Sequence, residues 1–239
     1  MSGNLLKILA CITMLTDHVG YLLFPDIAIL RYIGRISMPL FAFCIGEGCR
    51  HTRSISKYFI KVLALATLCQ AVFLTESLIS GGIHRLDFNI LFTFSFSILI
   101  CGSYKKLSSL GKEATRSEVI SYNALFIGAI LSALFCTTFL DMLVPIKIHF
   151  EYSFAGAVLP LFATFFEDKR RQLPAFTLGL LLFNLLLCTA TPYIWFSLVA
   201  LPIIYAYNGS RGKYSLKAFF YLFYPLHFAL LYLIQMIAF

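Results

Sequence analysis

Several ionisable residues lie inside stretches that are otherwise apolar, and they are the first candidates for chemistry. Asp17 and His18 are neighbours in the first apolar block, and Arg35 follows in the second. A charged group near the centre of a bilayer costs at least about 2.5 kcal/mol, so such groups mark functional sites by default. A carboxylate beside an imidazole orients the ring, and an arginine can hold an anion or polarise a carbonyl. The combination favours proton transfer in a dry site.

The spacing of these residues predicts that they meet. If the first helix starts at Leu5 near the cytoplasmic face, His18 lies about 20 Å deeper at 1.5 Å per residue. The connection at residues 25–26 is short, so the first two helices are neighbours and run in opposite directions. We therefore expect Asp17, His18 and Arg35 to lie together in the outer third of the membrane. Arg31, closer to the interface, is expected to extend its charged end towards water.

Three later segments add polar groups in the outer half of the same bundle. Asn89 and the pair Glu151–Tyr152 stand where two apolar segments begin on the outer side. His227 follows two residues after Pro225, which removes a backbone donor and can kink the last helix, and Tyr224 adds a hydroxyl beside it. For Asn89, Tyr152 or Tyr224 taken alone, a structural hydrogen bond between helices is the more ordinary interpretation.

The elements that carry these residues are membrane helices. The chain of 239 residues is 60% hydrophobic and only 13% charged, whereas soluble domains carry about 25% charged residues. About 20 apolar residues span the hydrocarbon as a helix, and the continuous apolar runs lack the alternation of a β-barrel. We predict an all-α, polytopic transmembrane bundle of about nine helices (eight to ten), forming one domain over 1–239. The predicted spans are 5–24, 27–49, 58–80, 88–102, 119–140, 152–166, 173–189, 193–207 and 216–238.

The distribution of lysine and arginine predicts the orientation. Basic residues gather in alternate connections, while the other connections hold only Arg85 and Lys147. By the positive-inside rule the basic side is cytoplasmic, with the N-terminus inside and the C-terminus outside. The net charge of +8 is then mostly a topology signal and no nucleic-acid signature, although a cytosolic anion such as coenzyme A could use part of it. The basic connections hold Arg50, Arg53 and Lys57; Lys105, Lys106, Lys112 and Arg116; Lys169, Arg170 and Arg171; and Arg211 and Lys213.

The seven cysteines all fall inside apolar blocks. None forms a CxxC pair, and no cysteine–histidine group has the spacing of a zinc site. We interpret them as small core residues and expect no metal.

An ordered set of short motifs resembles the TraX family of membrane proteins. Each motif is short, but a DH pair followed by GRxxxPLF and closed by FYPLH is a specific combination, and the resemblance runs almost end to end. The matching stretches are MLTDHVG around Asp17–His18, RYIGRISMPLFAF (31–43), GEGCRHTRSISKY (46–58), NILFTF (89–94), EYSFAGAVLPL (151–161), YNGSRG (207–212) and FYPLHF (223–228).

The resemblance implies a membrane acyltransferase that uses acetyl-CoA or a similar thioester as its acyl donor. Its acceptor would be an amine or hydroxyl on an extracytoplasmic protein, such as a pilin N-terminus, or on an envelope glycan, at the cytoplasmic membrane of a bacterium. Pilin-type members have no acid matching Glu47, a difference that would mark a subfamily. The family motifs fall on Asp17, His18, Arg35, Asn89, Tyr152 and His227.

These assignments lead to a mechanistic hypothesis. His18 would act as general base with Asp17 fixing its tautomer, while Arg35 and Asn89 stabilise the tetrahedral oxyanion. His227 would be a second acid/base or a substrate-orienting group. An acetyl-histidine intermediate is the covalent alternative, and the sequence does not choose between the two.

Binding residues are expected at both faces of the membrane. On the cytoplasmic side, Arg50, Arg53 and Lys57 would bind the phosphates of coenzyme A. On the outer side, Glu151, Tyr152 and Tyr224 would contact the acceptor.

Two other functions fit part of the pattern. A secondary transporter also carries intramembrane His, Arg and Asp, but transporters often show inverted repeats and paired broken helices, which the sequence lacks. A non-catalytic membrane partner would not need an Asp–His pair facing an arginine at matching depth.

Overall fold

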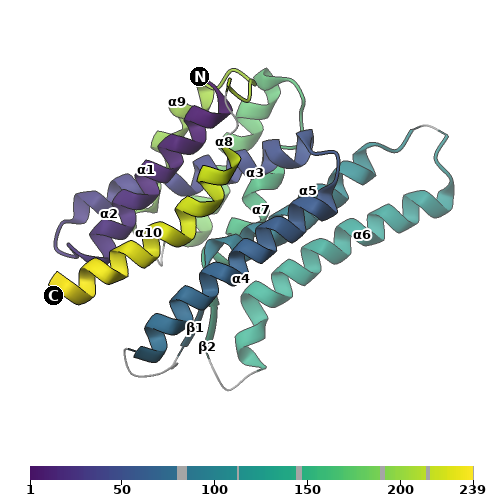
Figure 1. Ribbon diagram of the computed structural model, residues 1–239. Helices are drawn as coiled ribbons and strands as arrows, with labels where there is room; N and C mark the ends of the chain where they lie inside the picture. Colours follow the sequence, from purple (N-terminus) through teal and green to yellow (C-terminus); the bar gives the residue numbers. More distant parts are fainter. Residues whose placement is uncertain (80–84, 112, 144–146, 189–191, 214–215, 239) are drawn as a thin grey trace. The chain divides into compact units, whose positions relative to one another are not determined.

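A computed structural model describes residues 1–79, 85–111, 113–143, 147–188, 192–213 and 216–238 and is almost entirely helical (Figure 1). Six helical segments in this part of the chain are long and apolar enough to cross a membrane. They confirm a multi-pass, all-α membrane protein. The six are Gly3–Leu22, Ala28–His51, Ile55–Thr75, Ile90–Ser108, Arg116–Phe139 and Ala218–Ala238, and shorter apolar helices cover Ser153–Phe162 and Tyr193–Tyr205.

The residues form two compact units. The first unit comprises Met1–Cys44, Leu68–Gly82 and Thr177–Phe239, and the second comprises Ile45–Thr67 and Ile83–Phe176. Helices α3 (Ser37–His51), α4 (Ile55–Ile79) and α8 (Lys169–Leu187) each contribute residues to both units. The expectation of one domain over 1–239 stays a prediction.

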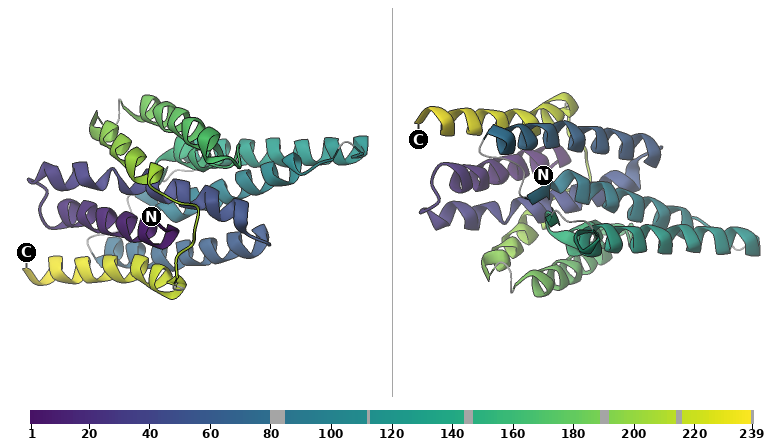
Figure 2. Two further views of the ribbon diagram at one scale, coloured as in Figure 1. Left: turned by 90° about the horizontal axis from the view of Figure 1, so that it is seen from above. Right: turned by 90° about the horizontal axis from the view of Figure 1, so that it is seen from below.

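In the first unit, α1 (Gly3–Leu22) lies between α2 (Ala28–Gly34) and α10 (Lys217–Ala238), as Figures 1 and 2 show. Small residues let α1 and α2 approach closely, as is common in membrane helix pairs. A Cβ on Gly20 would lie 2.6 Å from the Cβ of Leu30. The glycine therefore lets a side chain of one helix pack directly on the backbone of the other, which brings the polar side chains of the two helices within reach of one another.

The predicted span 27–49 is divided into two helices, α2 and α3. At the break, the N–H of Arg35 donates to the carbonyls of Arg31 at 3.3 Å and Tyr32 at 3.2 Å, and that of Ile36 donates to Ile33 at 3.2 Å. Pro39 has no N–H to offer the carbonyl of residue 35, so a regular helix cannot continue through this point. The break places Arg35 at a tightened turn.

The connection between α9 (Ala200–Tyr205) and α10 holds the start of α1. The N–H of Gly3 donates to the carbonyl of Ser210 at 2.7 Å, and the N–H of Asn208 donates to the carbonyl of Met1 at 2.9 Å. Gly212 adopts a φ of 101°, which favours glycine, and a Cβ there would lie 3.0 Å from Ser2 Oγ. The first of these bonds satisfies an amide that a helix N-terminus otherwise leaves without a partner, and the second ties the residue before the helix to the same connection.

In the second unit, α5 (Ile90–Ser108) packs on α6 (Arg116–Leu134) and α7 (Ser153–Phe162). Two short parallel strands, β1 (Arg85–Phe88) and β2 (Lys147–Phe150), directly precede α5 and α7 (Figure 1). The sequence pattern did not predict these strands. The rings of Phe88 and Phe150 stack across the pair with centroids 4.6 Å apart, so the strands fix where the two helices begin.

Two predicted spans are shorter or more extended than ordinary membrane helices. Helix α7 has 10 residues. The span predicted at 193–207 consists of the 3₁₀ helix η3 (Pro192–Val199, 8 residues) followed by α9 (6 residues). Because a 3₁₀ helix rises about 2.0 Å per residue and an α-helix about 1.5 Å, these 14 residues reach farther than an α-helix of the same length.

The orientation stays a prediction that labelling can check. On a background with all cysteines replaced, a cysteine at exposed Ser109 should react with a membrane-impermeant maleimide only after the cells are opened. A cysteine at exposed Leu143 should react in intact cells. The reverse pattern would overturn the positive-inside assignment.

Candidate active site

A buried carboxylate lies between two arginines in the first unit. Asp17 and Arg35 are only 8% and 7% exposed. Arg35 Nη2 donates to Asp17 Oδ1 at 2.7 Å and to Oδ2 at 2.8 Å. Arg31 Nη1 donates to Asp17 Oδ2 at 2.7 Å and to the Asp17 carbonyl at 3.1 Å. Charge-assisted bonds of this kind are the strong ones, and they join α1 to α2.

The structure confirms that Asp17 and Arg35 meet, but the expectation for Arg31 was wrong. Its charged end turns inwards to Asp17 and does not extend towards water. Arg31 lies one helical turn before Arg35, so both side chains leave the same face of α2. A guanidinium group is stabilised more by a buried carboxylate within reach than by the membrane interface. Both arginines therefore bind Asp17.

Aromatic rings cover both arginines. The guanidinium carbon of Arg31 lies 5.1 Å from the ring centroid of Tyr21, and that of Arg35 lies 5.6 Å from the ring of Tyr193. Tyr32 extends the aromatic layer, with its ring 5.8 Å from that of Tyr193. A guanidinium over an aromatic face gains about 0.5–2 kcal/mol, so these rings help to hold the charges in an apolar layer.

Gly34 is the residue that permits this cluster. A Cβ built on Gly34 would lie 2.0 Å from Asp17 Oδ1 and 2.3 Å from Asp17 Cβ. Gly34→Ala should therefore displace the carboxylate and lower the thermal stability in detergent, since overpacking costs about 1–3 kcal/mol or more. Gly128→Ala is the matched control, because nothing lies within 4 Å of a Cβ at that position in α6. Equal melting temperatures for the two variants would contradict the packing described here.

His18 contacts a second histidine. His18 Nδ1 lies 2.9 Å from His227 Nε2, and the two ring planes are within 17° of parallel with centroids 5.1 Å apart, so the rings meet edge to edge. His227, which is 5% exposed, also bonds the carbonyl of Phe223 through Nδ1 at 2.8 Å. The ring of Phe228 lies 4.2 Å from that of His18. The pair joins α1 to α10 within apolar surroundings.

This arrangement corrects the role expected for Asp17. The described contacts of the Asp17 carboxylate are with Arg31 and Arg35, and the described partner of the His18 ring nitrogen is His227. Consecutive residues on a helix point about 100° apart, so Asp17 faces α2 while His18 faces α10. The residue positioned to set the tautomer of His18 is His227.

Tyr224 lies beside the histidine pair. Its side chain is buried, and its ring centroid is 5.5 Å from that of His227 and 5.7 Å from that of Phe228. The structure thus brings His18, His227 and Tyr224 together, whereas a contact of Tyr224 with an acceptor stays a prediction.

The candidates Asn89 and Glu151, which were predicted for the outer side, belong to the second unit and hold helix ends there. Asn89 caps α5, accepting a bond from the N–H of Leu91 at 3.1 Å and donating to the carbonyl of Ala66 at 2.9 Å. The Glu151 carboxylate accepts from the N–H of Ile90 at 3.1 Å. Both ends of the Asn89 amide are engaged, which gives it a structural role. A part for Asn89 or Glu151 in chemistry stays a prediction.

Tyr152 precedes α7 in a strained backbone conformation. Its φ is 59° and that of Ser153 is 47°, and both lie in the left-handed region that residues with a Cβ rarely adopt. Such strain often accompanies functional sites. A binding role for Tyr152 stays a prediction.

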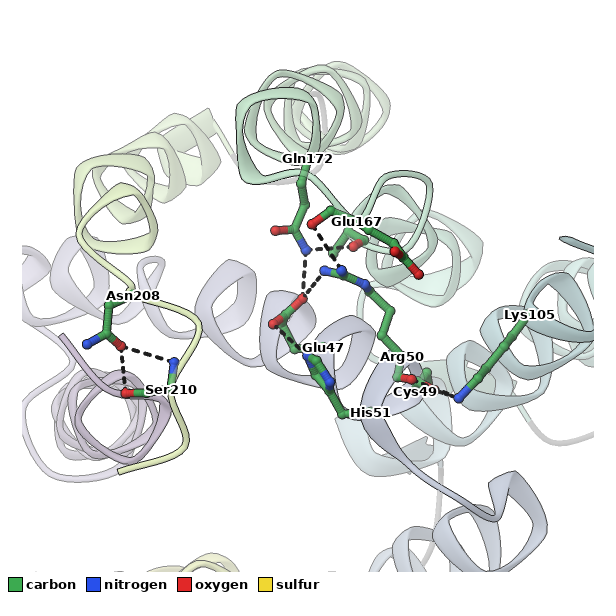
Figure 3. A network of polar contacts seen from close by, with 10 residues as sticks. Glu47, Cys49, Arg50, His51, Lys105, Glu167, Gln172, Asn208 and Ser210 are labelled. Atoms are coloured by element: carbon green, nitrogen blue, oxygen red, sulfur yellow. Dashed lines mark hydrogen bonds and ion pairs between the residues drawn. The ribbon is translucent and has the colours of Figure 1, made fainter. Parts of the chain in front are cut away.

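A polar network surrounds Glu47 in the second unit (Figure 3). Arg50 Nη1 donates to Glu47 Oε1 at 2.6 Å, and Gln172 Nε2 donates to the same oxygen at 2.7 Å. Arg50 also bonds the carbonyl of Glu167 at 3.2 Å. Lys105 Nζ caps the end of α3 by donating to three carbonyls, those of Cys49, Arg50 and Thr52, at 3.2, 2.7 and 2.9 Å.

This network bears on the residues expected to bind coenzyme A. The guanidinium of Arg50 is engaged with Glu47 and the α7–α8 connection, so it braces the protein around Glu47. Arg53 and Lys57 are exposed at the start of α4 and its connection to α3. Of the three residues, these two are the better placed to meet a ligand in solution.

Tyr193 and Gly34 were not predicted as part of the site, and Arg31 was predicted to face the interface instead. A usable signal existed for two of them, because Arg31 is one turn from Arg35 and Gly34 directly precedes it. Tyr193 is distant in sequence, and only the fold brings it to Arg35. Among the residues that the structure describes, no group of three or more His, Cys, Asp or Glu side chains is arranged to hold a metal ion.

Comparison with known proteins places the chain in a family. The chain is 26% identical over 238 residues to the "Probable fimbrial assembly protein FimC, serogroup H1" of Dichelobacter nodosus, covering 95% of this chain and 92% of that protein. It is 28% identical over 187 residues to "Uncharacterized protein RP591" of Rickettsia prowazekii (strain Madrid E), covering 68% and 74% respectively. No solved structure matches. The family profile described as TraX protein matches residues 2–235, and the chain therefore belongs to the TraX family.

Proposed function

We propose that this protein is a membrane acyltransferase that moves an acetyl group from acetyl-CoA to an amine or hydroxyl of an extracytoplasmic acceptor. The observation that carries the proposal is the part-buried His18–His227 pair between α1 and α10, next to the Asp17 carboxylate of α1 that holds two arginines. A histidine in apolar surroundings can take a proton from an incoming nucleophile. Buried guanidinium groups can stabilise the charge that develops on a carbonyl oxygen.

In the proposed reaction, His18 removes a proton from the acceptor N–H or O–H. The acceptor atom attacks the thioester carbon, and its new bond gives a tetrahedral intermediate whose oxyanion is stabilised by Arg35. The C–S bond then breaks, and the proton held by His18 is returned to the thiolate of coenzyme A. Acetyl transfer through an acetyl-histidine remains the covalent alternative.

The acceptor class is proposed from the relatives. One relative carries the name fimbrial assembly protein, and a protein of the cell envelope, such as a fimbrial or pilus subunit, is the proposed acceptor here. The proposed location is the cytoplasmic membrane of a bacterium, with donor and acceptor on opposite faces as the basic connections predict.

Arg53 and Lys57 are the proposed contacts for the donor phosphates. Changing both to glutamine should raise the KM for acetyl-CoA by about two- to thirtyfold, because two exposed charge contacts contribute about 0.2–1 kcal/mol each. The kcat should be unchanged, since the lost binding is the same in ground and transition states. Lys147→Gln, on β2, is a control that removes a single exposed lysine charge elsewhere in the chain. An unchanged KM in the double variant would remove these residues from the donor site.

Purified protein in detergent or nanodiscs tests the activity. Incubation with radiolabelled acetyl-CoA and fractionated cell-envelope proteins should transfer label to an acceptor and release free coenzyme A. Mass spectrometry of the labelled product then identifies the acetylated atom. Well-folded protein that neither transfers nor hydrolyses acetyl-CoA would exclude the proposal and favour a transporter or a non-catalytic membrane partner.

A further inference from the structure

The hydrogen bonds of His227 fix which of its nitrogens carries the proton. Its Nδ1 lies 2.8 Å from the carbonyl oxygen of Phe223, one turn earlier in α10. A carbonyl oxygen only accepts, so Nδ1 must be the N–H donor in this bond. A neutral imidazole has one N–H, and therefore Nε2 of His227 carries a lone pair.

The same reasoning then fixes the proton on His18. His18 Nδ1 lies 2.9 Å from His227 Nε2, and two lone pairs at this distance would repel. With His227 Nε2 as the acceptor, His18 Nδ1 must donate. The other nitrogen of a neutral His18, Nε2, then carries no proton, and its lone pair is able to accept one.

We infer that His227 is a positioning residue that holds His18 in the tautomer with a proton on Nδ1 and a free lone pair on Nε2, the nitrogen that acts as base. The catalytic part of this inference rests on the proposed acyl transfer. The aromatic contacts support it, because the Phe223 ring stacks on His227 at 5.0 Å and Phe228 lies 4.2 Å from His18. Both rings are thus held in one orientation.

The charge balance of the step follows from this pairing. When Nε2 of His18 takes the acceptor's proton, the ring becomes an imidazolium whose Nδ1–H already donates to a neutral His227. The bond becomes charge-assisted and therefore stronger. The proton returns from the same Nε2 to the leaving thiolate, so both rings end in their starting tautomers and no proton needs to leave through His227.

Nitrogen-15 NMR of histidine-labelled protein tests the tautomer without any acyl acceptor. At neutral to mildly basic pH, His18 should show a protonated Nδ1 and an unprotonated Nε2, with resonances assigned from His→Gln variants. The opposite pattern at His18 in the wild-type protein would overturn the inference whether or not the protein transfers acetyl groups.

Two variants of His227 connect the tautomer with the rate. His227→Gln keeps an oxygen that can accept from His18 Nδ1–H, whereas His227→Leu removes the acceptor. We expect His227→Leu to mix the His18 tautomers and to lower kcat between about tenfold and 10⁴-fold, the upper value being the cost of a wrong tautomer in a serine-protease triad. His227→Gln should recover a substantial part of kcat, with KM for acetyl-CoA little changed. His149→Leu, at an exposed site on β2, is the matched control.

The outcomes separate this inference from the proposed function. Active wild-type protein whose rate and His18 spectrum are unchanged by His227→Leu would overturn the inference and leave the acyl transfer intact. Wild-type protein with the expected tautomer but no acetyl transfer would overturn the proposed function and leave the positioning contact. If the His227→Leu variant does not fold, the nitrogen-15 spectrum of the wild-type protein still shows which tautomer His18 adopts.

Discussion

Replacing His18 with alanine is expected to lower the rate of acetyl transfer by about two to four orders of magnitude, the usual contribution of a general base. Under the proposed mechanism, His18 takes the proton from the acceptor, and alanine cannot. The variant should still insert and fold, because the main charged contact between α1 and α2, through Asp17, does not involve His18. Single-turnover measurements with saturating acetyl-CoA would isolate the chemical step from donor binding.

His149→Ala is the histidine-matched control for this experiment. His149 lies on β2 with 47% of its side chain exposed, near Asp87, and its loss should leave transfer unaffected. A folded His18→Ala protein that transfers acetyl at a near-normal rate would remove His18 from the mechanism. A loss of equal size in both variants would point to a general effect on the preparation.

The second large effect is expected from Arg35. Its guanidinium is the proposed oxyanion donor, and removing one such donor typically costs about 10²–10³ in kcat, or about 2.7–4 kcal/mol. Arg35→Gln should therefore lower kcat and leave KM for acetyl-CoA nearly unchanged, the signature of a contact made in the transition state. The double variant Arg53→Gln/Lys57→Gln should change KM alone. The contrast distinguishes a residue that acts on the reacting carbonyl from residues that bind the donor phosphates.

Arg35 also stabilises the fold, so activity and stability must be measured together. It makes two bonds to the buried Asp17 carboxylate, and breaking a buried ion pair costs about 3–5 kcal/mol. Arg31 keeps its bond to the Asp17 carboxylate in the variant and should limit that loss. Arg31→Gln is the control that removes an ion-pair partner of the same carboxylate. If it lowers kcat as much as Arg35→Gln does, the effect belongs to Asp17 and not to an oxyanion contact.

The membrane helices could be predicted because their signal is local. Continuous apolar runs fix where the chain crosses the bilayer, and the helices lie close to the predicted spans, as α1 (Gly3–Leu22) and α10 (Lys217–Ala238) show. The break at residues 35–36 was not predicted. It depends on Pro39, which lacks the N–H that would bond the carbonyl four residues earlier, so the helix breaks at a distance from the proline itself. The strands β1 and β2 were missed because four-residue pairings in connections leave little sequence signal.

The sequence by itself determined the class of protein, the family resemblance and the identities of the candidate residues. It also predicted correctly that Asp17 and Arg35 meet, because a short connection forces adjacent helices together and a buried charge needs a partner. Only the tertiary structure decided how the polar groups are paired. Asp17 and His18 are adjacent in the chain, but the 100° turn between them sends one to α2 and the other to α10. The partner of His18 is 209 residues away, and no local pattern encodes a contact that depends on how two distant helices pack.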